Sequence, residues 1–191
     1  MRKRKMISSF CLSLVMVIGL ITIVASGGGG GGGGGTDTPV DNTIDPNNIV
    51  PSSITTFDDE GGDICLEDGK PVIRMYSSST CPYCAWDANA FDPVAKMYVE
   101  DGLIVAHHWE IWDLYNRTGD DLLTDEVEGT IPESEIDIFG MFNPDYSTPT
   151  FVFGCKYTRE GASRYNYGLE AEAAEFMAVI EELLDLTTPA P

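Results

Sequence analysis

Two cysteines three positions apart, Cys81 and Cys84, have the clearest potential for chemistry in the 191-residue chain. They follow a segment with strand character and open a segment with helix character. A helix N-terminus carries partial positive charge and free amides that stabilise a thiolate, so Cys81 is predicted to be the nucleophile. Cys84 lies one turn further along and is predicted to resolve the mixed disulfide that Cys81 forms. The spacing therefore predicts thiol–disulfide exchange.

Two other interpretations of this C-x-x-C pair involve no catalysis: half of a zinc site, or a structural disulfide. A zinc site needs two further ligands, and the sequence offers no second C-x-x-C or paired Cys/His motif. His107 and His108 are adjacent in a predicted strand, so they point to opposite faces. We therefore predict no metal and no cofactor, and favour redox chemistry of the two thiols.

A strand–helix–strand unit is predicted to position the cysteines. Residues 71–77 form a short buried strand, and residues 81–90 have helical character. Asp92-Pro93 looks like an N-cap followed by proline at the first helical position, so a second helical stretch, or a kink, is predicted up to residue 100. Residues 103–109 form the next strand, joined to the first by a right-handed parallel crossover.

The rest of the folded part is predicted to complete a mixed sheet. Its segments are, in order, a polar surface excursion (114–130), a short helix (132–142), a third strand (148–154), a hairpin turn (159–161), a fourth strand (163–167) and an amphipathic helix (169–186). The predicted fold class is α/β, with a mixed four-stranded central sheet flanked by helices on both faces.

Cys-Pro-Tyr-Cys, the tripeptide Thr148-Pro149-Thr150 and the order of elements together resemble the thioredoxin superfamily over roughly residues 71–186. The resemblance implies a thioredoxin-like fold in which Pro149 is cis and faces the active site. It also implies that Thr148 and Thr150, with Pro149, contact the extended chain of a substrate. Pro82 and Tyr83, between the cysteines, are expected to contact the substrate as well.

The direction of electron flow stays open between oxidase, isomerase and reductase. Pro82-Tyr83 matches the dipeptide of glutaredoxins, whereas export and the long segment before Pro149 look more like envelope disulfide enzymes. The dipeptide tunes the reduction potential, and the family spans about −270 to −120 mV.

The resemblance also shows a departure in the groups that transfer protons. The buried acid of the family is replaced by Met75, six residues before Cys81. His107 lies roughly where thioredoxins keep a lysine, and Glu110 is another candidate for proton transfer. Trp86, just after the Cys81–Cys84 motif, is given no role.

The two remaining cysteines of the folded part, Cys65 and Cys155, are predicted to form a structural disulfide. If the third strand runs antiparallel beside the first, Cys155 lies near the start of the first strand, where Cys65 is also found. Such a bond persists outside the cytoplasm and adds about 2–4 kcal/mol. The alternatives are two buried free thiols or a second redox relay.

The first 56 residues are predicted to lie outside the folded domain. Residues 1–26 combine a basic start with an apolar run at 7–25, typical of a signal peptide or an N-terminal membrane anchor. The positive charges stay in the cytoplasm, so the rest of the chain is expected to be extracytoplasmic, either anchored or secreted. Residues 27–56 are predicted to be a Gly-rich flexible linker, which favours a membrane tether, and residues 57–188 to be the domain.

The chain has 31 acidic and 11 basic residues and a formal net charge of −20, which argues against nucleic-acid binding. The expected partners are exported proteins that carry thiols or disulfides, and a membrane or envelope redox partner. The alternative from another class is a non-catalytic binding module with a thioredoxin fold, in which the Cys81–Cys84 bond is only a structural brace.

Overall fold

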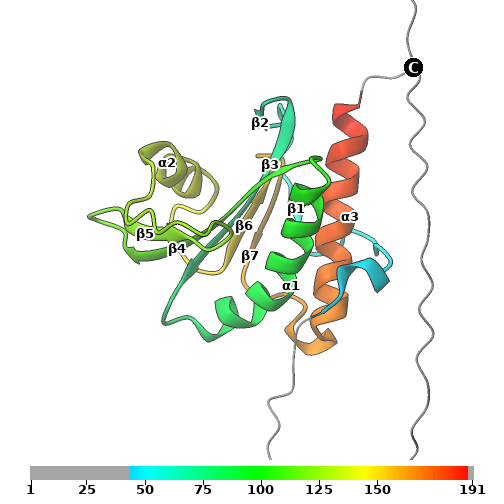
Figure 1. Cartoon of the computed structure of the whole chain (residues 1–191), viewed down its shortest axis with the longest axis horizontal. Coiled ribbons are helices and arrows are strands. Elements are labelled where there is room, and N and C mark those ends of the chain that lie inside the picture. The colour runs from blue at the N-terminus through cyan, green and yellow to red at the C-terminus, as the bar shows by residue number, and fades with distance from the viewer. Residues whose placement is uncertain (1–43, 189–191) are drawn as a thin grey trace, which may run out of the picture. The chain divides into compact units, whose positions relative to one another are not determined.

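The structure is a computed structural model that describes residues 44–188 (Figure 1). The predicted signal segment, with its apolar run at residues 7–25, and the linker up to residue 43 lie outside the described residues. The described part is an α/β domain with one mixed sheet and helices on both faces.

The sheet has seven strands rather than the four predicted. Their order is β1-β7-β6-β3-β4-β5, and the short β2 pairs with β3. β3 is central, parallel to β4 and antiparallel to β6. The bounds are β1 Asp58–Asp59, β2 Leu66–Glu67, β3 Lys70–Ser78, β4 Val105–Asp113, β5 Thr118–Asp121, β6 Thr150–Phe153 and β7 Tyr157–Glu160.

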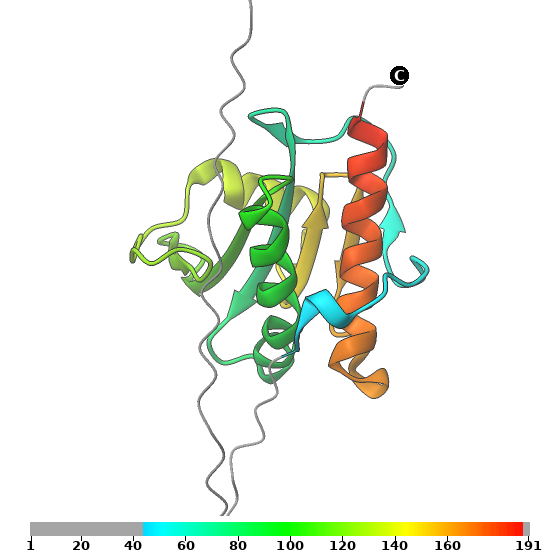
Figure 2. The same cartoon turned by 45° about the vertical axis from the view of Figure 1, so that its right-hand side comes forward.

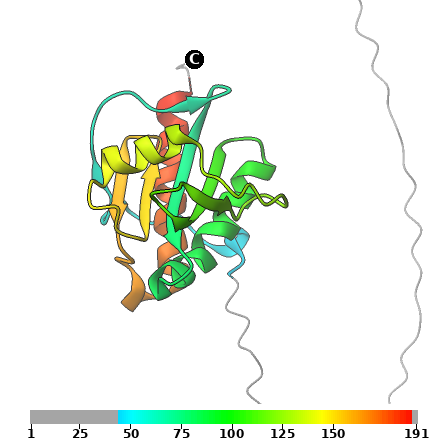
Figure 3. The ribbon, with the colours of Figure 1, turned by 90° about the vertical axis from the view of Figure 1, so that its left-hand side faces the viewer.

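Helices α1 (Pro82–Glu100) and α3 (Leu169–Thr187) cover one face of the sheet, and α2 (Glu133–Phe142) covers the other (Figures 1 and 3). The first face packs as a large core around Phe91 and Phe176. On the opposite face Tyr76 stacks on Phe139 of α2, with ring centroids 4.4 Å apart. The described part also contains two short 3-10 helices, η1 (Pro46–Asn48) and η2 (Tyr165–Tyr167).

Helix α1 is one helix through Pro93, so of the two predicted alternatives, a kinked helix and two abutting helices, the second is wrong. Pro93 lies inside it, and an interior proline costs about 3 kcal/mol because it removes a backbone hydrogen bond. Ala90, Phe91 and Val94 are buried on both sides of the proline. Their packing against the sheet offsets that cost and holds the helix in one piece.

The predicted hairpin turn at 159–161 and strand at 163–167 are wrong. The chain turns at residues 154–156 instead, so β7 begins at Tyr157 and pairs with β6, while residues 165–167 form η2. Cys155 adopts a positive φ of 54°, which non-glycine residues rarely do. Its disulfide to Cys65 holds this turn, in which the preceding Gly154 also has a positive φ, of 61°.

The predicted surface excursion at 114–130 contains the edge strand β5, which pairs antiparallel with β4. Gly119 permits this pairing, because a Cβ there would collide with the carbonyl oxygen of Glu110 and the side chain of Ile131. β4 itself runs to Asp113, four residues beyond the predicted end at Trp109.

Residues 44–56, which the sequence assigns to the linker, pack against the domain. Figure 2 shows η1 beside α1 and α3. Ser52 donates its backbone N–H to the carbonyl oxygen of Ala174 at 3.0 Å, and the backbone N–H of Thr56 donates to the Glu175 carboxylate at 2.7 Å. The folded unit therefore begins before Phe57.

Candidate active site

Cys81 is the N-cap of α1, directly after β3. Its backbone is extended, and its N–H donates to the carbonyl oxygen of Ser78 at 3.0 Å. The Cys81 Sγ accepts the backbone N–H of Cys84 at 3.1 Å, and Pro82 occupies the first helical position. Proline suits that position because its missing N–H would have had no helical partner. The sulfur of Cys81 thus lies where a 19-residue helix offers its positive end.

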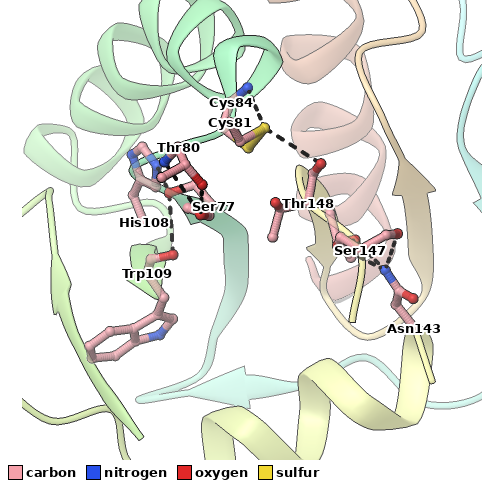
Figure 4. Close-up of a disulfide and its surroundings, with 11 residues drawn as sticks. Ser77, Thr80, Cys81, Cys84, His108, Trp109, Asn143, Ser147 and Thr148 are labelled. Atoms are coloured by element: carbon pink, nitrogen blue, oxygen red, sulfur yellow. Dashed lines mark hydrogen bonds between the residues drawn. A yellow bond between two sulfur atoms is a disulfide. The ribbon is translucent and has the colours of Figure 1, made fainter. Parts of the chain in front are cut away.

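Cys81 and Cys84 form a disulfide with Cα atoms 5.2 Å apart (Figure 4). The two sulfurs differ in access, because Cys84 is 2% exposed and Cys81 is half-buried. Pro82 and Tyr83, between them, are both exposed on the surface of the first turn. An incoming thiolate therefore meets Cys81 first.

The loop before β6 faces Cys81. The Thr148–Pro149 peptide bond is cis, as predicted. The carbonyl oxygen of Thr148 lies 3.5 Å from the Cys81 Sγ (Figure 4), close enough to accept a hydrogen bond from a reduced Cys81 thiol. The Pro149 carbonyl oxygen accepts the backbone N–H of Gly161 at 2.8 Å, which ties the loop to the end of β7.

Thr150, predicted to contact substrate, has its side chain in the loop interior. Its hydroxyl donates to the Ser147 carbonyl oxygen at 2.8 Å and accepts from Asn143 Nδ2 at 2.7 Å. Asn143 is fully buried and also donates to the Ser147 carbonyl oxygen at 3.0 Å. The sequence marks Asn143 only as the end of a helix, whereas the structure gives it the task of holding the loop that faces Cys81.

On the other side of the disulfide, a buried histidine lies against a small pocket (Figure 4). His108 is 1% exposed, with Nδ1 2.8 Å from Asp92 Oδ1 and Nε2 2.9 Å from Ser77 Oγ. The pocket has a volume of about 180 Å³, and its lining residues are Ser77, Ser78, Ser79, Cys81, Cys84, Ala85, Ala88, His108, Glu110 and Leu122. A histidine held in this way can pass a proton between the cysteine pocket and Asp92.

His107, the sequence's candidate for proton transfer, lies away from this pocket. Its Nδ1 is 2.7 Å from Asp121 Oδ2, and its ring stacks on Trp109. Burial lowers the pKa of His107, but the hydrogen bond and charge of Asp121 outweigh it, so the net shift is upward. The strand register explains why His108 rather than His107 lies at the pocket, because His108 is the residue that pairs with Met75 on β3. Glu110, the other candidate, does line the pocket.

A second group of ionisable residues is buried beneath the same stretch of α1. Asp87, one turn after Cys84, lies 3.9 Å from the Arg159 guanidinium, which donates to Glu172. Burial raises the pKa of Asp87, and the neighbouring charge of Glu172 raises it further. The guanidinium carbon lies 4.4 to 4.9 Å from the ring centroids of Phe57, Phe151 and Phe176. The sequence places Arg159 in a turn and gives no sign of this cluster.

The predicted disulfide between Cys65 and Cys155 is present. Their Cα atoms are 5.3 Å apart, and the backbone N–H of Cys65 donates to the Gly154 carbonyl oxygen at 2.8 Å. The bond closes the turn after β6 onto the segment before β3, at the opposite end of β3 from Cys81. It belongs to the scaffold of the sheet rather than to the pocket.

Comparison of the chain with protein-family models, with curated proteins and with solved structures found no match in any of the three. Between residues 44 and 188, no helix is long and apolar enough to cross a membrane. The same residues bring together no group of three or more His, Cys, Asp or Glu side chains that suits a metal ion.

Proposed function

We propose that the protein is an extracytoplasmic thiol:disulfide oxidoreductase that exchanges disulfides with exported proteins through Cys81 and Cys84. The observation that carries this proposal is the asymmetry of the pair. Cys81 is accessible, caps the N-terminus of α1 and faces the cis-Pro149 loop, whereas Cys84 is buried behind it. A nucleophile and a resolving thiol need this difference.

The arrangement of elements supports a thioredoxin-like fold. β3, β4 and β6 with α1 and α3 repeat the order and the strand directions that the resemblance implies. β7 then takes the place of the predicted fourth strand, and β1, β2 and β5 are short additions.

Exchange is a two-electron transfer in two steps. In the disulfide form, a substrate thiolate attacks the Cys81 Sγ, the Cys81–Cys84 bond breaks, and Cys84 leaves as a thiolate that takes up a proton. A second substrate thiolate then attacks the substrate sulfur of the mixed disulfide and releases the Cys81 thiolate. The substrate is oxidised to a disulfide and the protein is reduced to a dithiol. Reduction of a substrate disulfide follows the same steps in reverse.

The neighbouring groups of the pocket suit these steps. The helix N-terminus and the Cys84 N–H stabilise a negative charge on Cys81. His108 and Asp92 provide a route for the proton that Cys84 gains or loses. The Thr148 carbonyl and the loop that it belongs to offer backbone groups to an extended substrate chain.

The reduction potential of the Cys81/Cys84 pair tests the proposal. The full-length protein in detergent is equilibrated with glutathione buffers, alkylated, and each cysteine pair is quantified by peptide mass mapping. A potential between about −180 and −120 mV indicates an oxidase or isomerase, and one near −270 mV a reductase supplied by a membrane or envelope donor. A pair that stays oxidised below about −300 mV contradicts the proposal and leaves the binding module with a structural brace.

A further inference from the structure

We propose that an aromatic rim beside Cys81 selects the substrate, and that it binds cysteine-containing polypeptide segments with an aromatic and a basic side chain near the cysteine. The rim consists of Tyr83, Trp86 and Tyr165. This inference rests on the proposed function and names the substrate class for the same site.

The rim is built by two elements that meet next to the reactive sulfur. Tyr83 and Trp86 are three positions apart on the first turns of α1, so their side chains share one face of the helix. Tyr165 comes from η2, which lies beside the start of α1 (Figures 1 and 3). Its ring centroid is 5.3 Å from that of Tyr83 and 5.0 Å from that of Trp86, both in edge-on geometry.

Tyr165 contacts both other rings of the rim; Trp86 is partly buried, and the two tyrosines remain exposed. Tyr83 is 52% and Tyr165 49% exposed to solvent. The loop that carries Tyr165 is nevertheless anchored, because the Arg164 Nε donates to the Glu175 carboxylate at 2.7 Å and a second guanidinium nitrogen donates to Thr55. A fixed, half-exposed aromatic surface at the mouth of a reactive site is suited to an aromatic side chain of a partner.

Carboxylates flank the same site. Glu160 is exposed at the end of β7, and its carboxylate accepts the Ser147 hydroxyl of the cis-proline loop at 3.1 Å. Glu110 lines the pocket on the other side of the disulfide. Arg164, the cation closest in sequence to Tyr165, is engaged by Glu175. With a formal net charge of −20 on the chain, this surface complements a cationic segment and repels an acidic one.

The test is a set of short two-cysteine peptides that differ in one residue beside a cysteine: Phe, Ala, Lys or Glu. Their oxidation by the full-length protein is followed as kcat/KM with oxidised glutathione as the final oxidant, which returns the Cys81–Cys84 dithiol to the disulfide after each turnover, and the rate without protein is subtracted. We expect kcat/KM for the Phe peptide to exceed that for the Ala peptide by about threefold to tenfold, mainly through a lower KM, because aromatic pairs contribute on that scale. We expect kcat/KM for the Lys peptide to exceed that for the Glu peptide by a similar factor, and this factor to decrease when the salt concentration is raised.

Variants assign each preference to its residues. Tyr165→Ala is expected to remove the preference for Phe, and Tyr165→Phe to keep it, since the ring does the binding. Glu160→Gln is expected to reduce the preference for Lys alone. Leu66→Ala is the matched control, because Leu66 is 51% exposed at the far end of β3, beside Cys65, and its loss leaves both preferences intact.

Two results overturn the inference, and each points to a different failure. If the protein exchanges rapidly with dithiothreitol but treats the four peptides alike, the oxidoreductase proposal stands and the rim does not select substrates. If the Cys81–Cys84 bond resists dithiothreitol as well as every peptide, the proposed function itself fails.

Discussion

The described residues contain two disulfides at opposite ends of β3, which have similar Cα–Cα distances but different surroundings. Their Cα–Cα distances are 5.3 and 5.2 Å. Cys65–Cys155 joins residues 90 positions apart and closes a turn, whereas Cys81–Cys84 joins residues three apart at a helix start. If Cys81–Cys84 is reactive as we propose, its surroundings rather than its span separate it from the structural bond Cys65–Cys155.

The surroundings of Cys81–Cys84 contain the groups that the proposed exchange needs. A helix N-terminus stabilises the thiolate, a facing carbonyl loop offers backbone to a substrate, and His108 lies in the adjoining pocket. The Cys65–Cys155 bond instead connects the backbone at the start of β3 to the turn between β6 and β7. The comparison predicts that changes at one end affect reactivity and changes at the other affect stability.

The largest effect is expected from the cysteines of the helix start. Cys81→Ser abolishes peptide oxidation because it removes the sulfur that substrates attack. Cys84→Ser leaves Cys81 without its resolving partner, so mixed disulfides accumulate and are seen as covalent adducts by non-reducing electrophoresis and mass spectrometry. The double variant Cys65→Ala/Cys155→Ala is the control and retains exchange. Adducts of equal abundance on Cys65 or Cys155 would remove the distinction between the two bonds.

The next effect is on stability, and here we expect the loss of Cys65–Cys155 to matter more than the loss of Cys81–Cys84. Loss of Cys65–Cys155 lowers the free energy of unfolding by about 4 to 5 kcal/mol, which exceeds the 2–4 kcal/mol expected from the sequence because the bond spans 90 positions. Loss of the three-residue link costs only about 2 kcal/mol. Urea unfolding of Cys65→Ala/Cys155→Ala and of Cys81→Ser/Cys84→Ser gives both values. Equal losses of unfolding free energy in the two variants would contradict a purely scaffolding role for Cys65–Cys155.

A third effect separates the two adjacent histidines. His108→Leu removes the proton route at the cysteine pocket, and we expect reduction of substrate disulfides to slow about a hundredfold, as for loss of a general base. The slowdown should decrease as pH rises, because the Cys84 thiol then ionises without help. His107→Leu is the matched control, since that ring faces Asp121. A similar loss in both variants would assign the effect to the strand rather than to His108.

The geometry around Cys81 could be predicted from the sequence because its signals are local. Cys81 follows a buried apolar strand and precedes a proline at the first helical position, so the thiol, the strand and the helix start are all readable. The Cys65–Cys155 pairing followed from the antiparallel order of two strands alone.

The missed features depend on tertiary contacts. β7 reads Tyr-Thr-Arg-Glu and has no apolar run, and its Arg159 is buried only because Glu172 accepts its hydrogen bond. β5 reads Thr-Gly-Asp-Asp, yet the buried Asp121 at its end accepts the backbone N–H of His108. The choice of His107 shows how a one-residue error along a strand moves a side chain to the opposite face.

The smallest predicted effect concerns pH and the carboxyl one turn beyond Cys84. Burial first, and then the charge of Glu172, raises the pKa of Asp87 above its ordinary value of 3.8. A carboxyl with a raised folded-state pKa stabilises the fold fully below the ordinary value, and this contribution is lost as pH rises through the raised value. Between the ordinary value and the raised value of about 8, Asp87 should therefore make the protein less stable as pH increases, and Asp87→Asn should flatten that part of the dependence.

Urea unfolding over a pH series measures the slope, with Glu67→Gln as the control because Glu67 is an exposed carboxylate at the Cys65 end of the domain. If Asp87→Asn keeps the wild-type slope, Asp87 does not hold the proton beside Arg159 and the prediction fails. If Glu67→Gln flattens the slope equally, the effect comes from the net charge of the chain. Only a flattening confined to Asp87→Asn places a titrating group beneath the reactive cysteines and leaves the Cys65 end without one.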